Sequence, residues 1–155
     1  MAEKKTSQEA AGNFYGTTLW GGTGKCQLKS CGVVFKLDTN GNETLLHSFS
    51  GGADGGNPVA GLVMVSAGNL YGTTLTGGPQ GCLDYTCGVV FKLDQSGKET
   101  VLHTFSSFNG QTYGFGPEAG VIMDPAGNLY GTASLGGNLN DCQGEGCGVV
   151  FKITP

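Results

Sequence analysis

Residues 68–74 of this sequence are Gly-Asn-Leu-Tyr-Gly-Thr-Thr, and nearly the same heptapeptide occurs at residues 12–18 and 127–133. A second motif follows each copy: Cys-Gly-Val-Val-Phe-Lys-Leu at residues 31–37 and 87–93, and Cys-Gly-Val-Val-Phe-Lys-Ile at residues 147–153. The copies are 56 residues apart, then 59 or 60. Such a regular period is the signature of a tandem-repeat fold, in which each repeat buries its apolar face against the next.

Each repeat holds four short apolar runs rich in β-branched and aromatic residues, with turn residues between them. In the central repeat these runs are residues 61–65, 69–75, 88–94 and 99–105. The links after the first and third runs are short and contain Gly, Asn or Asp, which is typical of tight hairpins. Four antiparallel strands per repeat predict an all-β fold of β-propeller-like blades. A β-solenoid is the alternative, although its repeats are usually shorter.

The repeats divide the chain into four parts. These are residues 1–11, a polar N-terminal segment; 12–50, a partial blade of three strands; 51–106, a complete blade; and 107–155, another partial blade of three strands. A propeller ring needs at least about four blades, so about 2.5 blades per chain cannot close alone. We therefore expect a ring closed by homo-oligomerisation, with a dimer favoured. Two alternatives stay open: a piece of a longer repeat array, and a structural fragment that assembles through its incomplete end blades.

The composition excludes several classes of protein. With 30 glycines in 155 residues, a helical domain is excluded, because each glycine inside a helix costs about 1 kcal/mol. The eight basic residues are all lysine and the net charge is −4, which argues against a nucleic-acid surface. Lys36, Lys92 and Lys152 recur at one repeat position and are interpreted as solvated charges on an outward face. No stretch approaches the roughly 18 apolar residues of a membrane span, and residues 1–11 lack the apolar segment of a secretory signal.

The paired motifs resemble those of the GloVer tandem-repeat proteins of bacterial surfaces, over residues 12–155. They are also distantly similar to NHL-type β-propellers, whose blades carry a comparable pattern of Gly-Leu, Gly-Asn-Leu-Tyr and a strand like Val-Phe-Lys-Leu. The resemblance implies a secreted or surface-anchored repeat array with no well-defined activity. It also implies an extracellular or cell-surface location for the parent protein.

The links after the second and fourth runs are long and differ between repeats. They are residues 20–30, 76–86 and 135–146 after the second run, and residues 51–57 and 107–116 after the fourth. Alternate links of an antiparallel meander lie at opposite ends of the sheet, so these links share one end, which we call the long-link end. Since long loops on a rigid scaffold usually carry binding, this end is the predicted functional surface.

Six cysteines lie at the long-link end as three equivalent pairs, each with four residues between its partners. The pairs are Cys26 and Cys31, Cys82 and Cys87, and Cys142 and Cys147. An even number of cysteines in an extracellular chain predicts disulfides, and we expect each pair to close its own link. Zinc is an alternative, but it needs further ligands that no repeat supplies. Free thiols are the other alternative.

Residues that the repeat motif does not explain gather in the long links. Aromatic side chains mixed with amides and carboxylates suit carbohydrate or peptide ligands. The candidate ligand-binding residues are Trp20, Asp54, Asn57, Asp84, Tyr85, Phe108, Gln111, Tyr113 and Phe115. The first hypothesis is therefore a non-catalytic module that acts as a scaffold or binding surface without a cofactor; links without any function are the alternative.

A hydrolase is the second hypothesis, although the sequence contains no Gly-x-Ser-x-Gly, His-Glu-x-x-His or phosphate-binding motif. Its site would be assembled between subunits at the long-link end, with or without a divalent metal. The candidate catalytic residues are His103, Asp84, Asp141, Asp54 and Glu145. His47 and His103 occupy the same position in successive repeats, so packing between blades is the simpler interpretation of both.

Overall fold

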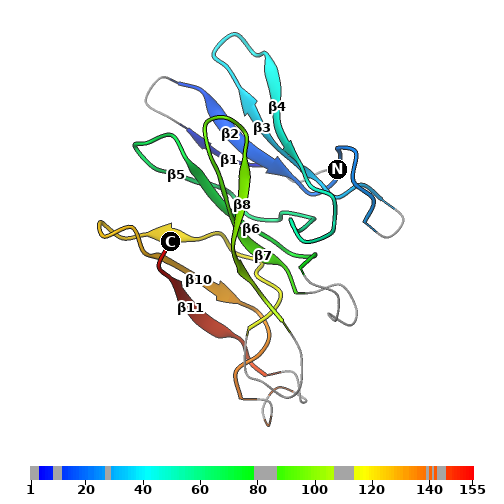
Figure 1. Ribbon diagram of the computed structural model, residues 1–155, viewed down its shortest axis with the longest axis vertical. Coiled ribbons are helices and arrows are strands. Elements are labelled where there is room, and N and C mark those ends of the chain that lie inside the picture. The colour runs from blue at the N-terminus through cyan, green and yellow to red at the C-terminus, as the bar shows by residue number, and fades with distance from the viewer. Residues whose placement is uncertain are drawn as a thin grey trace.

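The computed structural model is an all-β protein in which three antiparallel sheets follow one another along the chain (Figure 1). It describes residues 4–8, 12–26, 29–78, 87–106, 114–138, 140, 142 and 146–155. No α-helix occurs among these residues. The all-β class predicted from the sequence is therefore confirmed.

Each sheet is a meander, in which consecutive strands are hydrogen-bonded neighbours. Sheet one contains β1 (Lys4–Gln8), β2 (Phe14–Thr18), β3 (Val33–Leu37) and β4 (Glu43–Ser48). Sheet two contains β5 (Val63–Met64), β6 (Leu70–Thr74), β7 (Val89–Leu93) and β8 (Glu99–Thr104). Sheet three contains β9 (Ile122–Met123), β10 (Leu129–Ala133) and β11 (Val149–Ile153). The two repeat motifs thus form the same two neighbouring strands in every sheet.

The first strand is absent from the sequence prediction. Residues 1–11 were expected to be a polar segment outside a three-stranded first blade, yet β1 pairs antiparallel with β2 from Lys4↔Thr18 to Gln8↔Phe14. Ten strands were expected and the described residues contain eleven. An edge strand is held by main-chain hydrogen bonds, which need no apolar alternation in the sequence. Sheet one therefore has four strands instead of the predicted three.

Three of the short links in the described residues are hairpin turns closed by aspartate, whereas the turn at residues 65–69 is closed by backbone hydrogen bonds of Val65 with Gly68 and Asn69. The Asp38 carboxylate accepts hydrogen bonds from the backbone N–H groups of Asn40 (2.9 Å) and Asn42 (2.8 Å), and Asp94 and Asp124 form the same turn in their repeats. A hydrogen bond from the Asn42 side chain contributes most to lowering the pKa of Asp38. These residues therefore fix the turn, as asparagine and aspartate commonly do.

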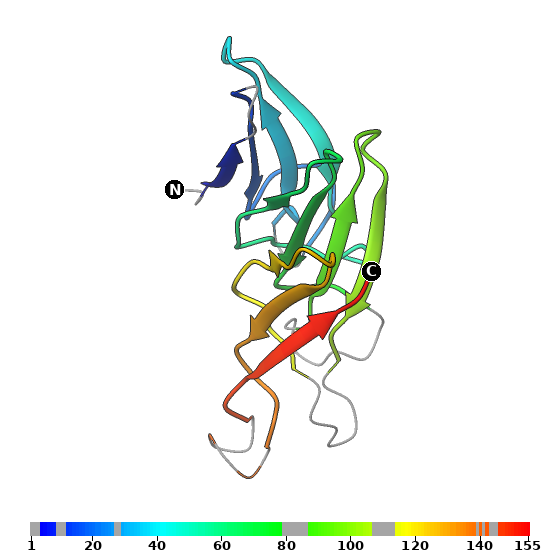
Figure 2. The ribbon, with the colours of Figure 1, turned by 90° about the vertical axis from the view of Figure 1, so that its left-hand side faces the viewer.

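Two hydrophobic cores hold the sheets together. The sheets succeed one another along the long axis of the molecule, with sheet two in the middle (Figure 2). Sheets one and two enclose the first core, which includes Val34, Phe49 and Phe91. Sheets two and three enclose the second, which includes Val90 and Phe105. Because sheet two is covered on both faces, all five residues of β6 are buried.

The two junctions between consecutive repeats are built in the same way. The hydroxyl of Thr17 in β2 donates to the carbonyl of Ala60 (2.9 Å), and that of Thr73 in β6 donates to the carbonyl of Ala119 (3.0 Å). The aromatic packing also recurs, since the Phe49 and Phe91 ring centroids lie 5.2 Å apart and those of Phe105 and Phe151 lie 5.1 Å apart. The sequence repeat is therefore also a repeat of tertiary contacts.

A cavity of about 610 Å³ lies between sheets one and two. Its lining residues are Tyr15, Lys36, Thr44, Leu46, Ser66, Gly68, Leu70, Asp94 and Gln95. The ammonium of Lys36 lies 5.9 Å from the centroid of the Tyr15 ring. The interpretation of Lys36 as an outward, solvated charge is therefore wrong, because this side chain is half-buried between two sheets.

Candidate functional site

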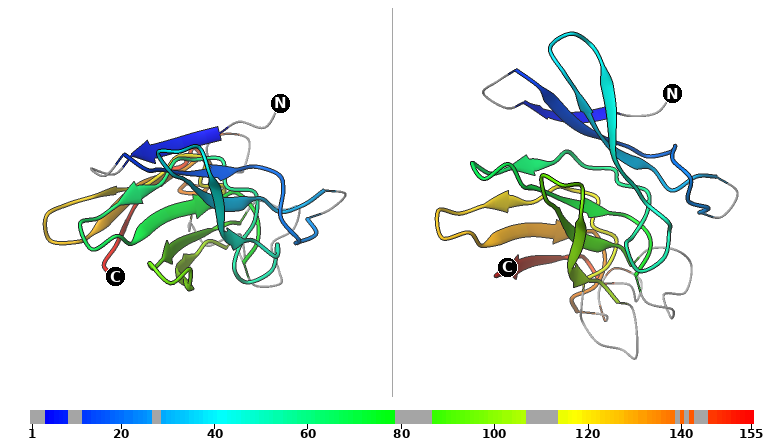
Figure 3. Two further views of the ribbon diagram at one scale, coloured as in Figure 1. Left: turned by 90° about the horizontal axis from the view of Figure 1, so that it is seen from above. Right: turned by 45° about the horizontal axis from the view of Figure 1, so that its top comes forward.

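The long-link end of the stack gathers the links that the sequence singled out. The links that follow β2 and β4 lie opposite the β5–β6 and β9–β10 turns (Figure 3). Around the first of these links, the Gly32 N–H donates to the Gly21 carbonyl (3.0 Å) and the Gly21 N–H donates to the Ser30 hydroxyl (2.6 Å). The Thr23 N–H ties the link to the end of β4, because it donates to the Ser48 hydroxyl (2.8 Å). This surface is therefore held by hydrogen bonds to the sheets beneath it.

Disulfides close the links that follow β2 and β10. Cys26 is bonded to Cys31 with their Cα atoms 5.0 Å apart, and Cys142 is bonded to Cys147 with a Cα separation of 5.4 Å. The disulfides predicted for these two pairs are confirmed. Cys87 is also disulfide-bonded, whereas Cys82 lies outside the described residues.

Trp20 and Lys29 form an exposed pair on the first link. The Lys29 ammonium lies 4.5 Å from the centroid of the Trp20 ring, within the range of a cation–π interaction. Trp20 remains exposed to solvent. Phe115 is half-buried instead and packs against the second core, where its backbone pairs with Leu135. Of the described aromatic candidates, Trp20 is thus the one that presents its ring to solvent.

Asn57 lies at the junction between repeats rather than on the surface. Its backbone N–H donates to the Cys31 carbonyl (2.6 Å), and its side-chain amide donates to the Leu19 carbonyl (3.0 Å). Its amide oxygen accepts from the Thr76 hydroxyl (2.9 Å). With a φ of 54° and only 5% of its surface exposed, Asn57 has a structural role in connecting sheet one to sheet two.

Asp54 is brought next to His47, not next to His103. The carboxylate of Asp54 lies 3.7 Å from Nε2 of His47, the penultimate residue of β4. Asp54 also accepts hydrogen bonds from the Ser50 backbone N–H (2.7 Å) and from the Ser50 hydroxyl. Partial burial raises the pKa of Asp54, but the interaction with His47 and the hydrogen bonds from Ser50 outweigh it and lower the pKa overall.

Glu99, at the start of β8 in sheet two, completes this cluster. Oε1 of Glu99 and Nε2 of His47 are both buried, and neither has a hydrogen-bond partner among the described residues. Burial raises the pKa of Glu99; the Asp54 charge acts in the same direction and His47 opposes it. The sheet-one residues His47 and Asp54 therefore share one half-buried site with a carboxyl group of the next repeat.

The cluster has the groups that acid–base chemistry requires. His47 lies beside the Asp54 carboxylate and interacts electrostatically with Glu99, and the pKa values of the two acidic groups move in opposite directions. Such a pattern is found in catalytic sites and in structural ion pairs. Within the described ranges, no three His, Cys, Asp or Glu side chains are placed to hold a metal ion. His103 lies one repeat further along, and burial lowers its pKa.

The other candidate residues of the sequence analysis lie outside the described residues. They are Asp84, Tyr85, Phe108, Gln111, Tyr113, Asp141 and Glu145. Sequence reasoning missed Glu99, because this residue was counted only as the start of a strand. Its signal was present: Glu43 and Glu99 occupy the same repeat position, four residues before His47 and His103 in the same strands.

We expect Glu99→Gln to change how stability depends on pH. Because burial raises the pKa of Glu99 in the folded state, the folded protein binds this proton more readily than the unfolded chain. The contribution of Glu99 to stability is therefore greatest below its ordinary pKa and is lost as the pH rises through the raised one. The glutamine variant should gain stability relative to the natural chain as the pH rises from about 4 to about 8, measured by urea unfolding.

Glu43→Gln is the matched control, because Glu43 has the equivalent position in sheet one and is exposed. It should leave the pH dependence unchanged. If both glutamine variants follow the natural chain at every pH, then Glu99 is not in the environment described here.

Comparison with known proteins identifies the repeat. The family model described as the Gloeobacter/Verrucomicrobia repeat matches residues 1–155, which confirms the resemblance to the GloVer-type repeats. No curated protein matches the chain. In the part of the chain that the structure describes, no helix has the length and apolar character needed to cross a membrane.

Proposed function

Because the chain belongs to the Gloeobacter/Verrucomicrobia repeat family, we propose that it is a non-catalytic repeat module whose long-link end is a binding surface. The observation that carries this proposal is the exposed pair of Trp20 and Lys29 on a link closed by the Cys26–Cys31 disulfide. A rigid sheet scaffold that presents variable links is a common design for recognition.

The sheets are interpreted as blades of a β-propeller ring that closes by oligomerisation. Support comes from the recurring antiparallel meander and from the two equivalent junctions between repeats. Two copies of the chain would supply six sheets, within the usual range of 4–8 blades. The sheets can therefore form the ring while the long links remain free to bind a ligand, since these links lie at one end of each sheet.

The ligands that best suit this surface are carbohydrates or peptides. An indole ring packs against the apolar face of a sugar or against a side chain, and the neighbouring ammonium offers hydrogen bonds to polar groups. The proposed location is extracellular or at the cell surface. Disulfides support this location, because they persist in oxidising compartments.

Trp20 also provides the test, because it is the chain's single tryptophan. Titration with oligosaccharides of β-linked glucose or N-acetylglucosamine, and with a mixture of casein peptides, should change its fluorescence in a saturable way. Trp20→Ala should weaken the binding measured by calorimetry by about tenfold or more, as expected for an aromatic residue at the centre of a contact.

Phe14→Ala is the control, because it removes a partly exposed aromatic ring at a different surface. It should leave the affinity unchanged. If none of these probes produces a fluorescence change or heat, the long-link end is not a surface for carbohydrates or peptides.

A hydrolase is the alternative, and the cluster of His47, Asp54 and Glu99 is the observation that favours it. In this role the half-buried carboxyl group of Glu99 would donate a proton and His47 would accept one. Turnover of chromogenic ester or glycoside substrates that is lost in Asp54→Asn would replace the binding-module proposal with this one.

A further inference from the structure

Three valines occupy one position of the repeat; two of them are buried and the third is exposed. Val34 in β3 and Val90 in β7 are 0% exposed, because the following sheet covers each of them. Val150 in β11 is 79% exposed. The face of sheet three that points away from sheet two, defined here by Ile122, Tyr130, Thr132, Val150 and Lys152, is the outer face of sheet three.

The polar groups of this face show the same difference: they are paired with the next repeat in sheets one and two and exposed in sheet three. Thr17 and Thr73 donate their hydroxyls to backbone carbonyls of the next repeat, while the equivalent Thr132 is exposed. The carbonyls of Cys31 and Cys87 accept backbone hydrogen bonds from the next repeat, at 2.6 and 3.4 Å. Their counterpart Cys147 is exposed. The outer face of sheet three thus presents, for the third time in the chain, the valine, the threonine hydroxyl and the cysteine residue that form a junction at sheets one and two.

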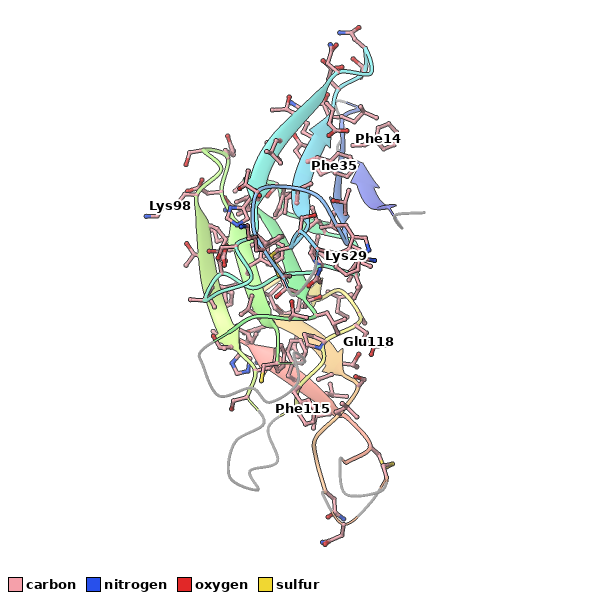
Figure 4. All side chains as sticks on the ribbon, turned by 90° about the vertical axis from the view of Figure 1, so that its right-hand side faces the viewer. Phe14, Lys29, Phe35, Lys98, Phe115 and Glu118 are labelled. Carbon is pink, nitrogen blue, oxygen red and sulfur yellow. A yellow bond between two sulfur atoms is a disulfide. The ribbon has the colours of Figure 1, made fainter. Side chains whose placement is uncertain are left out.

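The opposite end of the stack carries the complementary half of that junction. The outer face of sheet one is formed by Phe14, Val33, Phe35, Leu37 and Leu45, which correspond to the residues of sheet two that pack on sheet one. Phe14 is 38% exposed and Leu45 is 56% exposed, whereas Val33 and Phe35 are already buried within the chain, at 8% and 3%. Phe14 and Phe35 lie at this outer side, away from the rest of the stack (Figure 4).

Backbone register extends the match to hydrogen bonding. β1 pairs with β2 in the register in which β5 pairs with β6, so that Lys4 occupies the position of Ala60. The carbonyl of Ala60 accepts the Thr17 hydroxyl. When sheet three of one copy packs on sheet one of another, the Lys4 carbonyl of the second copy therefore takes the place of the acceptor for the Thr132 hydroxyl of the first.

Charge adds to the complementarity. Lys36 of sheet one and Asp94 of sheet two line the same cavity at the first junction. Their counterparts at the two ends are Lys152 on sheet three and Asp38 on sheet one. A second copy would bring these opposite charges together in the same way, which favours a copy of this chain over an unrelated apolar partner.

We propose that the outer face of sheet three binds the outer face of sheet one of a second copy, repeating between molecules the junction that the chain makes twice within itself. The inference rests on the proposed oligomeric ring and names the surfaces that close it. Such an interface is heterologous: it joins two different faces, and it closes only if the rotation between copies allows a ring.

Two charge substitutions test the two faces separately. Val150→Glu blocks the outer face of sheet three, and Leu45→Glu blocks the outer face of sheet one. Each should lower the self-association constant at least about 100-fold in sedimentation velocity, because a carboxylate would be buried without a partner. Ala53→Glu adds the same charge at an exposed position of the link between sheets one and two and should associate like the natural chain.

A one-to-one mixture of the two blocked variants gives the decisive result. Each partner retains one intact face, so the mixture should form a dimer that neither variant forms alone. If the natural chain associates but the mixture stays monomeric, or if Val150→Glu associates normally, the head-to-tail interface is wrong while oligomerisation stands. If the natural chain is monomeric up to about 1 mM, both proposals are wrong. Circular dichroism of each variant establishes that it is folded.

Discussion

Replacing Phe91 by alanine is expected to lower the free energy of unfolding by about 3–5 kcal/mol, the usual range for a fully buried phenylalanine. The Phe91 ring is 0% exposed, packs edge-on against Phe49, which directly follows β4, and lies so close over Gly72 that a Cβ there would be 2.8 Å from its Cζ. Since domains of this size are stable by only about 5–15 kcal/mol, the loss should be plain in urea unfolding.

Phe14→Ala is the matched control, because Phe14 faces the same way one sheet earlier and is 38% exposed. Its loss should be well under half of that caused by Phe91→Ala. Equal losses at the two positions would contradict the position of sheet two at the centre of the stack.

Gly88→Ala should destabilise the protein by about 2–5 kcal/mol, for two reasons that add. Gly88 has a φ of +77°, a conformation that an alanine adopts only with strain. A Cβ at this position would also overlap the Thr74 carbonyl oxygen and approach Cδ of Pro117, in the next repeat, to 2.9 Å. Thermal unfolding followed by circular dichroism measures the combined effect.

Gly41→Ala separates the two contributions. Gly41 has a similar φ of +85°, but a Cβ there would meet nothing within 4 Å. This variant should lose only the backbone contribution, about 1–2 kcal/mol. If Gly88→Ala is no worse than Gly41→Ala, the close approach of Pro117 to sheet two does not exist.

The repeating strands could be predicted because their sequence and their environment agree. Residues 69–75 and 88–94 are short runs rich in β-branched and aromatic residues, and they contain β6 and β7 as predicted. β1 could not be predicted in this way, because the hydrogen bonds that hold an edge strand carry no side-chain signal. The exposure of Val150 could not be predicted either, since the same motif surrounds Val34 and Val90 and only the position in the stack distinguishes them.

The candidate site was predictable only in part. The local disulfides follow from a spacing within one link, and Trp20 stands out because no other repeat has a tryptophan at this position. The proximity of His47 to Glu99 depends on how one sheet packs on the next, where Leu46 of β4 meets Gly97 of the turn before β8. That relation between distant segments is set by tertiary packing and leaves no local pattern.

The central claim is that one junction serves both within the chain and between chains. Native mass spectrometry of the untreated protein tests it most directly, because it counts the copies in each assembly. We predict a discrete oligomer, with two copies and six sheets as the expected ring. A monomer as the only species at concentrations where the variants are compared would contradict the account.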